Sequence, residues 1–157
     1  MAWTTPRTWS VNEQLTAALM NEQLRDNLSY LYGNAQLKLA TAFSHDEDEQ
    51  TTTSSTYVDT TVSATITTTL KATLLVIAYA QFRSSNTSYT AYVAIHDGTT
   101  QVLARSTTSI GYESGVWGLR VTGRAAGTYT YKFQFKITSG STARFRLAGL
   151  FIIAIPE

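Results

Sequence analysis

The sequence predicts a mainly β protein, in which an N-terminal arm and amphipathic helix precede an antiparallel β-sandwich of the jelly-roll type that assembles as a trimer. From residue 51 onward, apolar and polar residues alternate with a period of two, which is the pattern of half-buried strands. Turn residues divide this region into about seven or eight segments at spacings of roughly 8 to 15 residues, as in sandwiches. Charged residues make up only 15% of the chain, and the Thr and Ser that replace them are typical of sheets with neutral exposed faces.

Charge is distributed unevenly along the chain, which favours two modules over one mixed core. Residues 1–49 carry a net charge of −4 and residues 50–157 a net charge of +5, although the whole chain carries only +1 at pH 7. We therefore predict an N-terminal attachment and oligomerisation module over residues 1–33, an acidic linker over residues 34–50 and the β-sandwich over residues 51–157.

The composition excludes several classes of site and location. The chain contains no cysteine, so disulfides and thiolate metal sites are excluded. The N-terminus lacks the apolar run of a secretory signal peptide, and no apolar run approaches the roughly 18 residues of a membrane-spanning helix. We expect no signal peptide and no insertion into a membrane.

Two tryptophans lie in the first ten residues, which are predicted to form an extended arm. Trp3 and Trp9 occur in a stretch without a helical or strand period, and each could bury about 150 to 250 Å² of surface. They are expected to dock either onto the chain's own helix or onto another subunit.

An amphipathic helix is predicted from about residue 10 to residue 32. It has two possible N-terminal caps, a Ser-x-x-Glu capping box that begins at Ser10 and a later cap at Thr16, and Gly33 supplies its C-terminal stop. Leucines recur on one stripe of this helix: Leu15, Leu19, Leu24, Leu28 and Leu31. The spacing of the last three suits self-association of helices, and packing on the chain's own domain is the alternative.

One set of residues in the arm and helix carries a family resemblance: Trp3, Trp9, Thr16-Ala17-Ala18, Asn21, Leu24-Arg25-Asp26-Asn27-Leu28 and Leu31. These residues resemble the N-terminal segment of a group of tailed-bacteriophage structural proteins, many of which carry an all-β distal domain. The resemblance covers about the first fifth of the chain. It implies a virion protein, made in the host cytoplasm, that forms part of a tail fibre, a head fibre or a capsid decoration and contacts other capsid or tail proteins.

Two interpretations remain for each half of the segment that joins helix and sandwich. Residues 35–43 are either a short strand or an extended connector. Residues 45–49 form a dense charge run, whose like charges repel one another and predict a solvated linker. The alternative is a cation site at which a trimer brings three copies together, because carboxylates are suitable calcium ligands, although the run lacks the spacing of a calcium loop.

The strand segments differ in how many of their faces are apolar. Residues 57–70 place a core face, which includes Leu70, opposite a row of threonines. Residues 129–137 alternate aromatic with polar residues, as a half-buried antiparallel strand does. Residues 72–82 are apolar on both faces, so this strand must be covered twice.

The remaining segments are predicted to be joined by tight turns. The sequence His96-Asp97-Gly98-Thr99 supplies turn residues for a hairpin between residues 89–95 and 101–106. Residues 116–122 form a further strand. Ser139-Gly140-Ser141 is predicted to turn a hairpin into the last strand, residues 143–155, on which Phe145, Leu147, Gly149, Phe151, Ile153 and Ile155 would share a face.

Two strands with two apolar faces, centred on Val76 and Phe151, are the predicted interface of a homotrimer. The residues assigned to it are Leu75, Ile77, Tyr79, Leu150 and Ile152. The strand order, which ends in an apolar strand after an aromatic one, is similar to the trimeric tumour-necrosis-factor or C1q type of jelly roll found in phage fibre tips. This resemblance is one of architecture.

The sequence contains no motif of an enzyme, since it lacks a cysteine nucleophile, a nucleophile elbow, a zinc-protease motif and a phosphate-binding loop. We expect no catalysis and no cofactor. A net charge near zero also argues against nucleic-acid binding. The alternative to a structural role is a receptor-binding module for a host-surface glycan, because aromatic faces stack on sugar rings; its candidate residues are Tyr112, Trp117, Arg120, Arg144 and Arg146.

Overall fold

The structure of the protein is a computed structural model that describes Thr8, Val11, Gln14, residues 16–28 and residues 40–157. The chain divides into two compact units, Met1–Lys38 and Leu39–Glu157, which are described separately. The predicted arm residues Trp3 and Trp9, and Leu31 of the predicted helix, lie outside the described residues.

The N-terminal unit contains a short helix that changes its winding. The α-helix α1 (Ala17–Met20) continues directly into the π-helical segment η1 (Asn21–Asp26), and the Leu19 backbone N–H donates to the Thr16 hydroxyl at 3.3 Å. Thr16 is therefore the cap of this helix.

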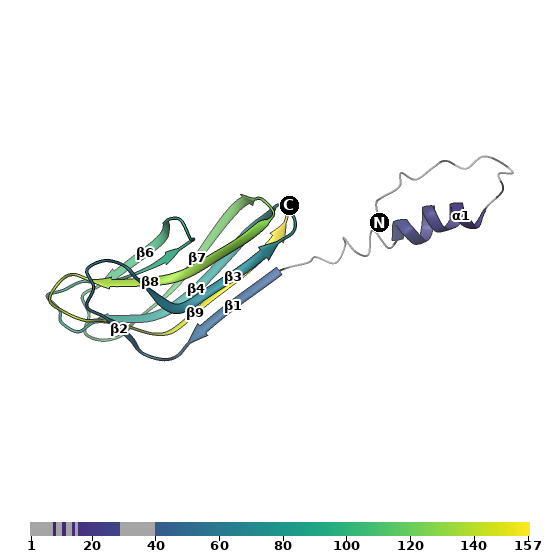
Figure 1. Cartoon of the computed structure of the whole chain (residues 1–157). Helices are drawn as coiled ribbons and strands as arrows, with labels where there is room; N and C mark the ends of the chain where they lie inside the picture. The colour runs from purple at the N-terminus through teal and green to yellow at the C-terminus, as the bar shows by residue number, and fades with distance from the viewer. Residues whose placement is uncertain (1–7, 9–10, 12–13, 15, 29–39) are drawn as a thin grey trace. The chain divides into compact units, whose positions relative to one another are not determined.

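The C-terminal unit is an antiparallel β-sandwich with the strand order of a jelly roll (Figure 1). The first sheet, here called the β9 sheet, has the order β1 (Ala40–Asp46), β9 (Ala143–Pro156), β4 (Ala72–Ser84) and β7 (Glu113–Arg124), and β2 (Gln50–Thr52) also pairs with β9. The second, the β8 sheet, has the order β3 (Val58–Thr68), β8 (Gly127–Ile137), β5 (Ala91–His96) and β6 (Gln101–Thr107). Of these strands, β5 and β6 form the hairpin that the sequence predicts.

The core lies between the inner faces of the two sheets. Phe133 of β8 stands edge-on to Trp117 of β7 and to Phe145 of β9, with ring centroids 5.8 and 5.3 Å apart. The alternation predicted for β8 is confirmed, because Tyr131, Phe133 and other residues of this face are buried. The threonine row of β3 faces outward and bonds to β8 through hydroxyl pairs, whereas Leu70, predicted for the core face, is 58% exposed beyond the end of the strand.

The predicted acidic linker is wrong for residues 40–50, which belong to the sandwich. Strand β1 pairs with β9 along its whole length, from Ala40 opposite Ala154 to Asp46 opposite Ala148. Two of the acidic side chains have partners in the sandwich: the hydroxyl of Thr61 donates to Asp46 and lowers its pKa, and Arg144 pairs with Glu49. A domain boundary at residue 50 would remove β1 from its sheet.

The predicted hairpin between the last two strands is also wrong. β8 pairs with β3 and β5, whereas β9 pairs with β1, β2 and β4, so residues 138–142 cross from one sheet to the other. The inner faces of both strands are aromatic, and Phe135 of β8 lies 5.6 Å from Phe145 of β9 between ring centroids. These faces bury each other across the core, which they could not do as neighbours in one sheet.

A β-bulge in β9 changes which residues face the core. Tyr79 of β4 lies opposite Gly149 and Gln81 lies opposite Arg146, so two residues of β9 oppose one of β4, and Leu147 has a positive φ of 45°. The extra residue shifts the alternation by one position. Phe145 therefore shares the inner face with Leu150 and Ile152, which are fully buried, and these two residues are corrected from the predicted interface to the core.

Candidate functional site

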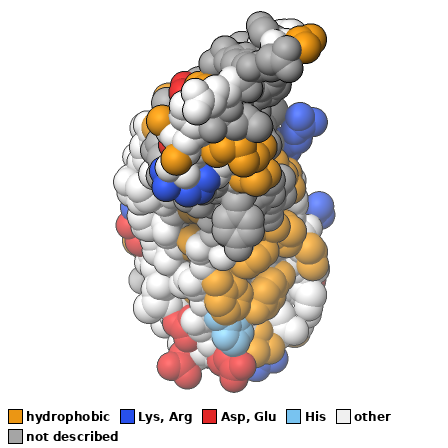
Figure 2. Space-filling model, turned by 90° about the vertical axis from the view of Figure 1, so that its right-hand side faces the viewer, with side chains coloured by type: hydrophobic (Ala, Val, Ile, Leu, Met, Phe, Trp, Pro, Cys, Tyr) orange, Lys and Arg blue, Asp and Glu red, His pale blue; other side chains and the backbone are white. Residues whose placement is uncertain are grey.

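The outer face of the β9 sheet is apolar over most of its width. Four large side chains are exposed on it: Phe43 of β1 by 61%, Ile77 and Tyr79 of β4 by 44% and 38%, and Val116 of β7 by 72%. Figure 2 shows hydrophobic side chains gathered in a band on one face, with a histidine at one end of it. We call this surface the outer apolar face.

The strand register arranges this face in rows across the sheet. Phe43, Phe151, Ile77 and Gly118 lie opposite one another on β1, β9, β4 and β7. The next row contains Tyr79, whose ring covers Gly149, because a Cβ added to that glycine would lie 2.5 Å from the ring. Gly149 thus lets the tyrosine lie flat on the sheet.

The predicted interface residues fall into two groups. Leu75, Ile77 and Tyr79 alternate on the outward side of β4, so the structure brings these three together. Leu150 and Ile152 lie on the opposite side of β9. Their neighbours Phe151 and Ile153, which the sequence analysis placed on the face of Phe145, occupy the outward positions instead.

At one end of the same face, three arginines surround a tyrosine, and we call this set with its acidic partner the arginine cluster: Arg83, Arg144, Arg146, Tyr112 and Glu49. The guanidinium carbons of Arg146 and Arg83 lie 3.8 and 4.9 Å from the centroid of the Tyr112 ring. The Tyr112 hydroxyl and the Arg144 guanidinium both donate to the Glu49 carboxylate.

The arginine cluster includes three of the five predicted ligand residues. Tyr112, Arg144 and Arg146 lie together, whereas Arg120 is opposite Leu75 in the register of β4 and β7. Trp117 is only 4% exposed and packs in the core, so the prediction that it contacts a ligand is wrong. Arg83 and Glu49 were not predicted, since only the pairing of β4 and β2 with β9 brings them to this place.

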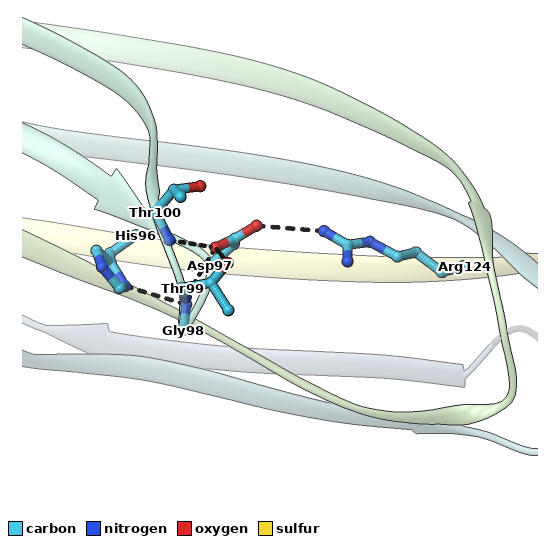
Figure 3. Close-up of polar contacts among 6 residues, drawn as sticks. All are labelled: His96, Asp97, Gly98, Thr99, Thr100 and Arg124. Atoms are coloured by element: carbon cyan, nitrogen blue, oxygen red, sulfur yellow. Dashed lines mark hydrogen bonds and ion pairs between the residues drawn. The ribbon is translucent and has the colours of Figure 1, made fainter.

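Figure 3 shows a second polar network, at the turn between β5 and β6. The Asp97 carboxylate accepts hydrogen bonds from the backbone N–H groups of Thr99 and Thr100 and from the Thr99 hydroxyl, at 3.0, 2.9 and 2.7 Å. Arg124 donates to its other oxygen at 3.2 Å. His96 accepts from the Gly98 N–H at 3.0 Å. The bonds from Gly98, Thr99 and Thr100 close the turn, and the bond from Arg124 ties the turn to the end of β7, so the network is structural.

Burial alone would raise the pKa of Asp97, but the hydrogen bonds from Thr100, Thr99 and Arg124 outweigh it and hold that pKa well below its ordinary value. The carboxylate therefore stabilises the fold above the unfolded pKa of about 3.9, and this contribution is lost as pH falls from there toward the folded pKa. We expect Asp97→Asn to lower the free energy of unfolding by about 2 kcal/mol at pH 7.

The difference between wild type and Asp97→Asn should shrink by about 1 kcal/mol between pH 7 and pH 3, as measured by urea unfolding at one protein concentration. Glu113→Gln, at an exposed position, is the control and should show a smaller difference at both pH values. An equal loss in Asp97→Asn at pH 7 and pH 3 would contradict the role of the ionised carboxylate.

Within the described residues, no group of three or more acidic or histidine side chains is placed to hold a metal ion. The charge run 45–49 is engaged in part by protein groups, since Glu49 binds Arg144 and Tyr112. None of the helices in the described part of the chain has the length and apolarity that a membrane crossing requires.

Comparison with known proteins gives a relationship of fold. No protein-family model matches the chain, and no curated protein sequence matches it. The structure of Eiger TNF from S. frugiperda is similar with a TM-score of 0.51 and 11% identity, over 76% of this chain and 94% of that one. The structure of infectious bursal disease virus, Gx strain, matches with a TM-score of 0.47 and 14% identity, over 76% of this chain and 32% of that one. The C-terminal unit has the jelly-roll fold of TNF-like proteins.

Proposed function

We propose that this protein is a non-enzymatic structural component of a virion, which assembles as a homotrimer through the outer apolar face and is attached to the particle by its N-terminal segment. The observation that carries the proposal is the exposure of Phe43, Ile77, Tyr79 and Val116 on one sheet. Contiguous exposed apolar surface of this kind marks an interaction site.

A second copy of the chain is the partner that fits this face best. The central rows consist of aromatic, aliphatic and glycine positions, and such a surface can pack against another copy of the chain without requiring complementary charge. The trimeric state is supported by the resemblance of the strand order to trimeric jelly rolls of the tumour-necrosis-factor type.

The N-terminal unit is proposed as the attachment element. Leu24 and Leu28, both predicted for this role, are 50% and 62% exposed, so these two leucines keep apolar surface available for a partner. The resemblance of this segment to tailed-bacteriophage structural proteins supports a capsid or tail protein as that partner, and a tail fibre, head fibre or capsid decoration as the place.

Light scattering on the full chain tests the assembly, and we expect a mass three times the 17.3 kDa of one chain. A monodisperse monomer at micromolar concentration would overturn it. Immunogold labelling of purified particles tests the location, and particles that carry no label while the protein is expressed would overturn the virion role. For the second candidate function, glycan recognition, Trp117 is lost as a contact residue because it is buried, whereas Tyr112, Arg144 and Arg146 lie together in the arginine cluster.

A further inference from the structure

The arginine cluster holds more positive charge than its protein partners neutralise. Arg144 pairs with Glu49, whereas Arg146 donates to the side-chain oxygen of Gln81 at 3.1 Å and Arg83 to the backbone oxygen of Ile110 at 3.0 Å. The last two acceptors are neutral. Among the described residues, Glu49 is thus the one carboxylate that forms an ion pair with any of these three arginines.

The fold forces these like charges together. Arg83 of β4 and Arg144 of β9 lie directly opposite each other in the antiparallel register, an arrangement that is destabilising for like charges. Arg146 projects from the same side of β9, two residues further along. The faces of Tyr112 hold the guanidinium groups of Arg83 and Arg146 by cation–π contact, which fixes their positions without removing their charge.

The arginines also retain unused hydrogen-bond donors. The Nε atoms of Arg83 and Arg144 are buried and have no hydrogen-bond partner within the described part of the chain. A guanidinium presents five donors in a rigid fork, and the bonds described above use one on each arginine. The site is open to solvent at the same time, because the side chain of Arg144 is 35% exposed.

We infer that the arginine cluster is a binding site for an oxyanion, meaning a phosphate, sulfate or carboxylate group. Converging guanidinium groups match the arrangement of the oxygen atoms in such anions. A guanidinium is also weakly hydrated, which favours replacing its bound water by an anion. An anion here would offset the repulsion between Arg83 and Arg144. All of its residues belong to one chain, and they lie at one end of the outer apolar face rather than in its central rows. The oxyanion can be a free ion or a group on an acidic polysaccharide.

Isothermal titration calorimetry on the full chain tests the inference with two probes, inorganic phosphate and a sulfated oligosaccharide, at low salt. Arg146→Gln should weaken the binding of whichever probe binds by about tenfold or more, the effect of losing a charged donor. Glu49→Gln should strengthen it about threefold, because the one competing negative charge is removed. Tighter binding of the oligosaccharide than of phosphate would identify a polysaccharide as the source, and the reverse a free ion.

Arg105→Gln is the matched control, since it removes one exposed positive charge on β6 of the other sheet. The affinity of Arg105→Gln for the probe that binds should stay within about twofold of the wild-type affinity. The inference is overturned if neither probe binds, if Arg105→Gln weakens binding as much as Arg146→Gln, or if Glu49→Gln weakens it. Glu49→Gln keeps the test decisive even where Arg146→Gln fails to fold, because the two variants are expected to change affinity in opposite directions.

Discussion

Ile77→Glu is expected to convert the assembled protein into folded monomers, lowering its mass from three times 17.3 kDa to 17.3 kDa in light scattering. Ile77 is 44% exposed at the middle of the outer apolar face, between Phe151 of β9 and Gly118 of β7. In a trimer that buries this face, each copy would bury an unpaired carboxylate, which costs several kcal/mol per copy (about 3 to 5). In the monomer the carboxylate points to water, so the sandwich should remain folded.

Leu70→Glu is the matched control for Ile77→Glu. Leu70 is 58% exposed in the turn between β3 and β4, away from the paired rows of the outer apolar face, so this variant should keep the mass of the wild type. If Ile77→Glu also keeps that mass, the outer apolar face is not the interface. If both variants dissociate, added charge rather than position would explain the effect.

The strands could be predicted from the sequence because their alternation is local. In β8 each aromatic residue of the inner face lies two positions from the next. This period is a property of the strand itself and does not depend on which strand pairs with it. The choice of neighbour is not local. Residues 127–137 and 143–156 are adjacent in the chain, which favours a hairpin, but their inner faces bury each other only from opposite sheets.

The bulge at Leu147 could not be predicted from residue type. A positive φ is ordinarily adopted by glycine or asparagine, and the nearest glycine, Gly149, lies two positions further along. The sequence-based pattern therefore continued the alternation from Phe145 to Phe151 and Ile153, and placed Leu150 and Ile152 on the wrong side. For β1 (Ala40–Asp46) the sequence allows a short strand up to residue 43, but the repulsion within the charge run predicts a linker beyond it, because the partners Thr61 and Arg144 are distant in sequence.

Only part of the arginine cluster could be predicted from local sequence. Arg144 and Arg146 share one face of a single strand, and their period of two is visible in the sequence. Arg83 joins them through the pairing of β4 with β9, and Glu49 through the return of the chain next to β2. Residues so far apart in sequence are brought together by the pairing register of β4 and β9. The bulge in β9 shifts that register by one residue.

Because of the bulge in β9, Ile152 faces the core and Ile153 faces outward. The same substitution at these two positions should therefore affect folding differently. Ile152 is fully buried opposite Val76, whereas Ile153 lies opposite Leu75 on the outer apolar face. Ile152→Glu would place a carboxylate in the core without a partner, at a cost of about 5 kcal/mol or more. That loss is comparable with the whole stability of a small domain, so we expect this variant to be unfolded by circular dichroism.

Ile153→Glu serves as the control for Ile152→Glu, because it makes the same chemical change one position along the same strand. Its carboxylate would reach solvent in a monomer, so it should keep the β-sheet spectrum and lose less than about 1 kcal/mol of unfolding free energy in urea at a concentration where the trimer has dissociated. In the straight alternation without a bulge, Phe145 and Ile153 would share a face, and Ile153 would then face the core. Unfolding of Ile153→Glu together with a folded Ile152→Glu would therefore contradict the bulge itself, and with it the assignment of Phe151 and Ile153 to the outer apolar face.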